Sequence, residues 1–325
     1  MEKMIRAGVD PTEFLSITSY FNPSKGSLRR NNYRVFRKHL NTLLLTVEWA
    51  PDGVFELQQG DADFLIQVAG GDLVWQKECL LNIAIDQAKR LGVRCAAFVD
   101  CDIVFQNDRW FEGVSDALQT HDFVQCFGSI DYLPALDIER LTREALVNVQ
   151  PVAKLESMVK RLQDGFGFYK DVQTDTGTNH TGPIGANPGM ATAINLQKHP
   201  DWKFYDRNIV GGGDGLLLAA MSGYLDEFFD KGNHSMPFRA HATEWMAQHV
   251  PPTPSLAYVP NHLFHLWHGS LTSRQYTKRY EVLSWHGYNP ATDVIAEPDL
   301  PLRLDPRKRE LKSDIYKYLA SRGDA

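Results

Sequence analysis

The first 130 residues alternate between short apolar segments and amphipathic segments, and this alternation restricts the fold more than any other feature of the chain. Strands are expected at 14–21, 43–49, 63–71, 95–100 and 122–130. Helices are expected at about 27–39, 73–92 and 108–121. Strands that are separated by helices pair in parallel, with right-handed crossovers and helices on both faces of the sheet. The sequence therefore predicts an α/β fold with a doubly wound, mostly parallel sheet.

The second half of the sequence is less regular. One long helix is expected at about 137–163, followed by a Gly- and Thr-rich segment, 164–190, that is long enough to be a lid ordered on binding. After it we expect a strand at 191–196, a glycine-rich turn and helix at 211–223, a histidine cluster at 262–268 and a basic-aromatic helix at 273–283.

Composition and charge narrow the class of protein. With 325 residues, 43% of them hydrophobic, the chain can bury a full core. The apolar runs are too short for a membrane span and the first residues lack an apolar signal core, so we expect a cytoplasmic protein without membrane association. The four cysteines lack zinc-ligand spacing and indicate reduced, packed thiols. A net charge of −6 argues mildly against a protein whose main task is to grip nucleic acid.

Six basic residues and no acidic one lie between Lys25 and Lys38. On a helix, four of them would share one side: Arg30, Arg34, Arg37 and Lys38. This pattern fits an anion site and a solvated helical face equally well.

Two aspartates, Asp100 and Asp102, end the fourth expected strand. Burying a lone carboxylate is costly unless something neutralises it. In sheets of this class, ligands bind beyond the carboxyl ends of the strands, and the aspartates fall there. Cys101, between them, is expected to point to the opposite face. Their position favours a functional site, although a bound cation and plain solvation both account for the two residues.

The second half adds further candidate ligands. His262, His265 and His268 could supply an imidazole, and Asp214 lies in a glycine-rich turn where the backbone can approach a ligand closely. Carboxylate oxygens with one imidazole suit Mn²⁺ or Mg²⁺, and phosphate oxygens would complete the shell. The alternative is that the histidines are packed or capping residues.

Five segments, taken in order, resemble nucleotide-sugar-dependent glycosyltransferases of the GT-A fold. They are TSYFNPS with the arginines after it, WQKECLLN, VDCDIVF, GGGDGLL and HLWHGSLTSRQYTKR. The likeness covers about residues 14–290 and is greatest to a group of glycosyltransferase-like proteins common in bacteria, protists and large viruses or phages. It implies one GT-A-like domain, 1–325. Within it we expect a nucleotide-sugar-binding half (1–130), an acceptor and catalytic half (131–290) and a C-terminal helical extension (291–325).

The resemblance also implies roles for single residues. The expected donor-binding residues are Thr18, Tyr20, Arg29, Arg30, Lys77, Asn82, Asp100 and Asp102. The expected metal ligands are Asp100, Asp102 and His268, with His265 as the second choice of histidine. Asp214 matches the position where inverting members keep a catalytic acid residue, and it is the expected general base. Many members have Glu-Asp there, whereas Gly213 precedes Asp214 in this chain. Surface charge explains the basic residues equally well. Trp75 could also contribute to the donor site, although helix packing explains Asn82 and Trp75 equally well.

The expected donor is a UDP-sugar, and the acceptor is less constrained. A 5-hydroxymethylated pyrimidine in phage DNA leads the candidates because of the basic segments 25–38 and 271–312 and the likeness to viral proteins; the enzyme would then work in the host cytoplasm. Aromatic residues of the 164–190 segment, Phe166, Phe168 and Tyr169, could help to flip a base. A glycan or a small molecule is the other option. Two further classes stay open: a nucleotidyltransferase or metal-dependent hydrolase on the same sheet, and a non-catalytic nucleotide-sugar binder.

Overall fold

The computed structural model describes residue 10 and residues 12–137, 142–168, 185–269 and 278–322. Within them, seven strands form the central sheet in the order β11-β6-β10-β4-β1-β2-β3. The strands are β1 (Phe14–Phe21), β2 (Leu44–Ala50), β3 (Phe64–Ala69), β4 (Cys95–Val99), β6 (Phe123–Gln125), β10 (Ala191–Asn195) and β11 (Leu256–Tyr258). All pairings are parallel except the two made by β10, which runs against the others. The predicted α/β class with a mostly parallel sheet is confirmed.

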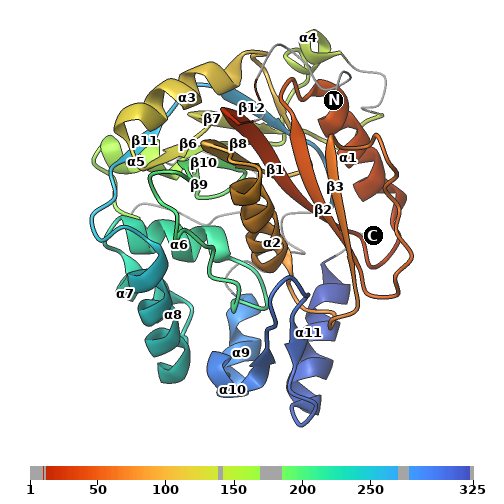
Figure 1. The fold of residues 1–325 in the computed structure, drawn as a ribbon, viewed down its shortest axis with the longest axis vertical. Helices are drawn as coiled ribbons and strands as arrows, with labels where there is room; N and C mark the ends of the chain where they lie inside the picture. The colour runs from red at the N-terminus through yellow and green to blue at the C-terminus, as the bar shows by residue number, and fades with distance from the viewer. Residues whose placement is uncertain (1–9, 11, 138–141, 169–184, 270–277, 323–325) are drawn as a thin grey trace.

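Helices cover both faces of this sheet (Figure 1). Side chains of α2 (Lys77–Arg90) share a core cluster with Ile17 and Val47. Side chains of α1 (Ser27–His39) and α3 (Trp110–Thr120) share a second cluster with Tyr20. Successive residues of a strand point to opposite faces, so β1 contributes alternately to the two clusters. The chain passes from β1 to β2 on one side and returns to β4 on the other, which makes the carboxyl ends of β1 and β4 the switch point of the sheet.

A second sheet lies beside the first and carries part of the site. Its order is β5-β12-β7-β8-β9, in which β12 pairs antiparallel with β5 and parallel with β7. Its strands are β5 (Ile103–Phe105), β7 (Ser129–Tyr132), β8 (Ala153–Ser157), β9 (Ala186–Asn187) and β12 (His262–His265). Because β5 follows β4 after three residues, the chain at Asp100 and Asp102 passes from one sheet to the other.

The other elements pack around these sheets. They are α4 (Arg143–Leu146), α5 (Met158–Gln163), α6 (Gly213–Met221), α7 (Leu225–Lys231), α8 (Met236–His249), a 3₁₀ turn at Lys278–Tyr280, α9 (Glu281–Trp285), α10 (Pro290–Asp293), the hairpin of β13 (Val294–Ile295) and β14 (Arg303–Leu304), and α11 (Arg309–Ser321). Figure 1 shows α7 to α11 extending below the central sheet.

Three local predictions are wrong. The fifth strand is two strands, β6 and β7, that belong to different sheets, because the chain turns between them at Cys126–Gly128. The long helix at 137–163 is replaced by α4, β8 and α5. Arg37 does not join an exposed basic face: it is buried and pairs with Asp63 at 2.8 Å. Residues 169–184 and 273–277 of the expected lid and basic helix lie outside the described residues.

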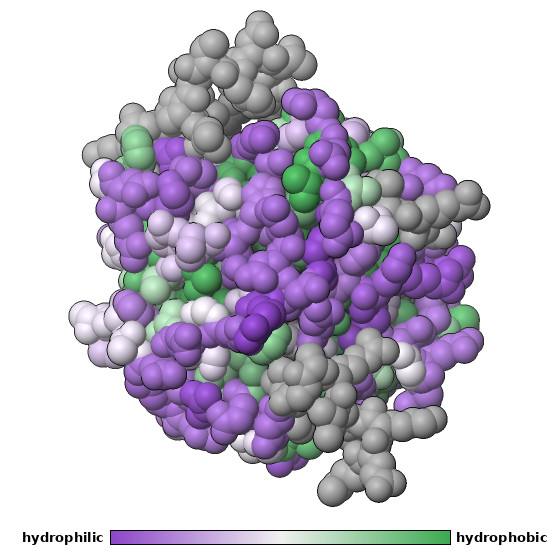
Figure 2. All heavy atoms as spheres, turned by 90° about the horizontal axis from the view of Figure 1, so that it is seen from above, coloured by the Kyte–Doolittle hydropathy of each residue, from purple (hydrophilic) through white to green (hydrophobic). Residues whose placement is uncertain are grey.

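The structure also bears on what the sequence indicated about the cysteines and about membrane spans. All four cysteines are buried, free thiols, as expected. Figure 2 shows a face that is hydrophilic over most of its described area, with small hydrophobic patches. Among the described residues, every helix is too short or too polar to cross a bilayer.

Candidate active site

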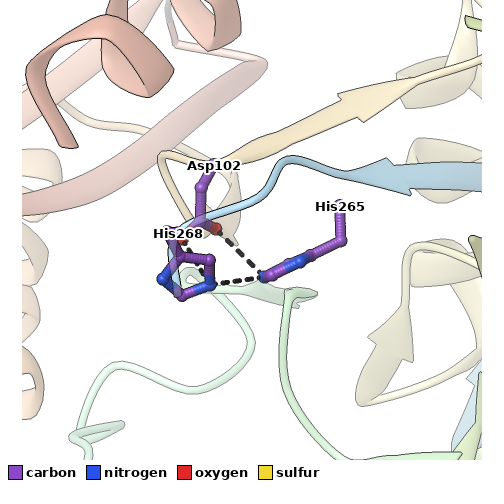
Figure 3. Close-up of side chains that lie close together, drawn as sticks. All are labelled: Asp102, His265 and His268. Carbon is purple, nitrogen blue, oxygen red and sulfur yellow. Dashed lines mark hydrogen bonds and ion pairs between the residues drawn. The ribbon is translucent and has the colours of Figure 1, made fainter. Parts of the chain in front are cut away.

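One carboxylate and two imidazoles meet at the junction of the two sheets (Figure 3). The Nε2 atoms of His265 and His268 lie 2.8 Å apart. Asp102 places one carboxylate oxygen 3.4 Å from Nε2 of His268 and the other 3.9 Å from Nε2 of His265. Both histidines are buried. The expected choice between the two histidines is therefore unnecessary, because the fold brings both to Asp102.

Strand pairing explains this convergence. In the β5–β12 ladder, Ile103 pairs with His265, and the N–H of Leu266 donates to the carbonyl of Asp102 at 2.8 Å. Asp102 therefore lies at the end of the ladder, next to the segment that carries both histidines. From α1, the buried side chain of Asn32 donates to the carbonyl of Trp267 at 2.9 Å. This bond holds the backbone directly before His268.

These three residues fit a divalent metal ion. Their ligand atoms all lie within 4.8 Å of one another, and imidazole nitrogens with a carboxylate oxygen are common ligands of first-row transition metals. Two imidazoles make the set less suited to Mg²⁺, which prefers oxygen. Of the two expected ions, Mn²⁺ fits the donor set better.

Asp100 points to a different partner. Its carboxylate lies 2.8 Å from Nζ of Lys77, and the same nitrogen lies 2.9 Å from the carboxylate of Asp214. Burial alone would lower the pKa of Lys77, but the surrounding carboxylates outweigh it and raise that pKa well above its usual value. Burial, against the opposing effect of Lys77, raises the pKa of Asp100 to about 6. The sequence pair Asp100–Asp102 is thus divided between an ion-pair cluster and the Asp/His/His group.

The glycine-rich turn before α6 holds Asp214 in place. Gly212 has φ +96°, and a Cβ there would lie 2.0 Å from the hydroxyl of Tyr280. A Cβ on Gly213 would lie 2.3 Å from Oε1 of the Glu78 carboxyl group. Position 212 requires glycine because of its backbone conformation and its contacts, and position 213 requires it because of its contacts. The turn therefore lies directly against Glu78 and Tyr280.

The segment that leads into β10 contacts Asp100 and Asp214. The N–H of Asp100 donates to the carbonyl of Met190 at 2.8 Å. Gly189 lies so close to Asp214 that a Cβ there would be 2.7 Å from its Oδ2. Beside this cluster is a small cavity lined by Ser19, Lys77, Leu81, Phe98, Val99, Asp100, Met190, Thr192, Phe204 and Asp214.

Three of the residues expected to bind the donor are buried in the core. Thr18 and Tyr20 are buried on the α1 face of the sheet, where the hydroxyl of Tyr20 donates to Glu56 at 2.8 Å. The amide of Asn82 is bonded to the backbone of Phe204 through both its nitrogen and its oxygen. These three side chains serve the core.

The other candidates for the donor site are Arg29, Arg30 and Trp75. The guanidinium of Arg29 stacks on Phe21 at 5.4 Å from the ring centroid. Arg30 is half-buried on α1. Trp75 packs edge-on against Phe21 and under the guanidinium of Arg322.

Ser19, Glu78 and Asn32 were not among the expected site residues. Ser19 could have been found, because strand alternation sends it to the face opposite Thr18 and Tyr20. Glu78 is the neighbour of Lys77 and is buried, and burial, reinforced by repulsion from Asp214, raises its pKa to about 8. Asn32 gives no sequence signal, because its partner lies 235 residues away.

Neither the family models nor the curated protein sequences match this chain. Among solved structures, it is similar to a protein from Desulfovibrio desulfuricans G20 described as a nucleotide-diphospho-sugar transferase, at 11% identity and TM-score 0.34, over 86% of this chain and 96% of the other. It is also similar to S. aureus TarS 1–349 in complex with UDP-GlcNAc (14%, TM-score 0.32, 66% of this chain and 54% of that one) and to a second structure of S. aureus TarS (12%, 0.36, 85% and 41%). The chain therefore spans about half the length of the TarS structures. Since the TM-scores are below 0.5, these likenesses do not establish an activity.

Proposed function

We propose that the protein is a metal-dependent glycosyltransferase that moves a sugar from a nucleotide sugar, first of all a UDP-sugar, to an acceptor hydroxyl. The observation that carries the proposal is that two clusters of side chains lie together at the switch point of the sheet. Asp102, His265 and His268 could hold a cation, and Asp214 lies with Lys77 and Asp100 nearby. Ligands of parallel α/β sheets bind at this edge.

In the proposed reaction Asp214 is the general base. The acceptor oxygen bonds to the anomeric carbon while the bond from that carbon to the diphosphate oxygen breaks, and its electron pair leaves with the diphosphate. Asp214 takes the proton of the acceptor hydroxyl, which is typically worth about 10² to 10⁴ in rate. Attack opposite the leaving group inverts the anomeric centre. When bound at Asp102, His265 and His268, a divalent cation supplies positive charge that stabilises the departing diphosphate.

The structure weakens one basis for a DNA acceptor. In the basic segment near the C-terminus, Arg303, Arg307, Lys308 and Lys312 all pair with acidic residues of this chain. Arg37, in the other basic segment, is buried against Asp63. A hydroxymethylated pyrimidine in DNA is therefore one acceptor to assay, beside glycans and small alcohols.

The test of the base is Asp214→Asn. We expect sugar transfer to be lost while the affinities for Mn²⁺ and for the donor stay the same, because the amide keeps the shape but cannot accept the proton. Loss of donor binding would instead make Asp214 a binding residue. Binding without turnover in the wild type, for all donors and acceptors, would favour the non-catalytic binder. Transfer of a nucleotidyl group would favour the nucleotidyltransferase.

A further inference from the structure

A single ammonium group connects three elements of the site. Lys77 is the first residue of α2, Asp100 follows β4, and Asp214 lies in the first turn of α6. Nζ of Lys77 is 2.8 Å from Asp100 and 2.9 Å from Asp214, and the side chain is only 12% exposed. A cation with two carboxylate partners in a largely buried position has little freedom to turn elsewhere, since leaving either carboxylate unpaired is costly.

Asp100 and Asp102 are divided by the turn between β4 and β5. Asp102 faces His265 and His268, whereas Asp100 faces Lys77. The N–H of Asp100 also donates to the carbonyl of Met190, so its backbone is fixed as well. This arrangement gives the two carboxylates separate partners, and Asp100 is paired with a lysine that also holds Asp214.

We propose that Lys77 is a positioning residue that orients the Asp214 carboxylate, and that Asp100 anchors Lys77 and is not a metal ligand. The inference rests on the proposed function, in which Asp214 is the base. It gives Lys77 and Asp100 roles other than the donor and metal contacts expected from the sequence. The two ion pairs, Asp100–Lys77 and Lys77–Asp214, then link the turn that carries Asp102 to Asp214, the residue that removes the proton of the acceptor hydroxyl.

The test compares Lys77→Met, Asp100→Asn and the double variant in sugar transfer. We expect Lys77→Met to lower kcat roughly 10²-fold, with donor KM and Mn²⁺ affinity unchanged, because a base displaced by about 1 Å loses activity on that scale. Asp100→Asn should also lower kcat, but it should add little in the Lys77→Met background, since Asp100 acts through Lys77. Lys77→Arg should restore part of kcat. Lys89→Met, a lysine change at the other end of α2, is the matched control.

Three results would overturn the inference: an unchanged kcat in Lys77→Met, a raised donor KM as its main effect, or weakened Mn²⁺ binding in Asp100→Asn. Thermal melting of each variant identifies any that fail to fold, in which case Asp100→Asn and Lys77→Arg carry the comparison. If the wild type transfers no sugar, the proposed function fails by itself. Calorimetric Mn²⁺ titration then still tests Asp100, because only Asp102→Asn should lose binding and an equal loss in Asp100→Asn contradicts its assigned role.

Discussion

Glu78 should make the stability of this protein depend on pH in a measurable way. Its side chain is buried against Gly213, and its Oε1 has no hydrogen-bond partner among the described residues. Burial, followed by repulsion from Asp214, raises its pKa from 4.5 to about 8. Between these two values the folded protein holds a proton here that the unfolded chain has released.

The sign and size of the effect follow from this difference. The native state binds more protons than the unfolded state, so the free energy of unfolding falls as the pH rises, by about 1.4 kcal/mol per pH unit for one proton. From about pH 5.5 to 7.0 this amounts to roughly 2 kcal/mol. This contribution of Glu78 to stability is complete below pH 4.5, its pKa in the unfolded chain. It is lost as the pH rises through about 8, its pKa in the folded protein. Glu78→Gln, which has nearly the same shape and no charge, should remove this dependence.

Urea unfolding of the wild type and Glu78→Gln at several pH values measures the effect. We expect the stability of the variant, relative to the wild type, to increase steadily with pH across that window. Glu227→Gln, at an exposed position, is the matched control for loss of one surface carboxylate. A difference between Glu78→Gln and the wild type that does not change with pH would refute the reasoning.

Two further predictions concern the neighbours of the site. Asn32→Asp cannot donate to the carbonyl of Trp267, so the loop of His268 should loosen and Mn²⁺ affinity should fall by roughly tenfold in calorimetric titration; an unchanged affinity would show that this bond does not order the ligand. Gly189→Ala places a Cβ 2.7 Å from the Asp214 carboxylate and should lower kcat by about 10²-fold while Mn²⁺ affinity and melting temperature stay the same. Wild-type kcat in that variant would mean that the exact position of Asp214 does not matter.

Local patterns were enough to predict most of the central sheet. The strands β1 to β4 and the helices α1 to α3 lie close to their expected positions, because apolar periodicity records which side chains are buried. The second sheet could not be predicted in this way. Its strands come from five separate segments, and pairing between distant segments leaves no local periodicity.

The site shows the same limit at the level of single residues. Asp100 and Asp102 looked like one ligand pair because they are neighbours in sequence, yet the turn between two sheets sends them to different partners. Thr18 and Tyr20 were expected at the donor site, although they share the buried α1 face of β1. Strand alternation alone places both side chains on that face. The family resemblance implied that Asp102 shares a metal ion with one histidine, but the approach of both histidines to Asp102 follows from the β5–β12 pairing.

The most direct test of the proposed function is nucleotide release from a panel of UDP- and GDP-sugars, with and without Mn²⁺, by the wild type and Asp102→Ala. We expect slow, Mn²⁺-dependent release from one donor by the wild type and none by the variant, since Asp102 supplies the carboxylate of the proposed metal site. Such a result would also identify the donor for acceptor assays. Absence of release and of Mn²⁺-dependent donor binding in the wild type would contradict the proposed function.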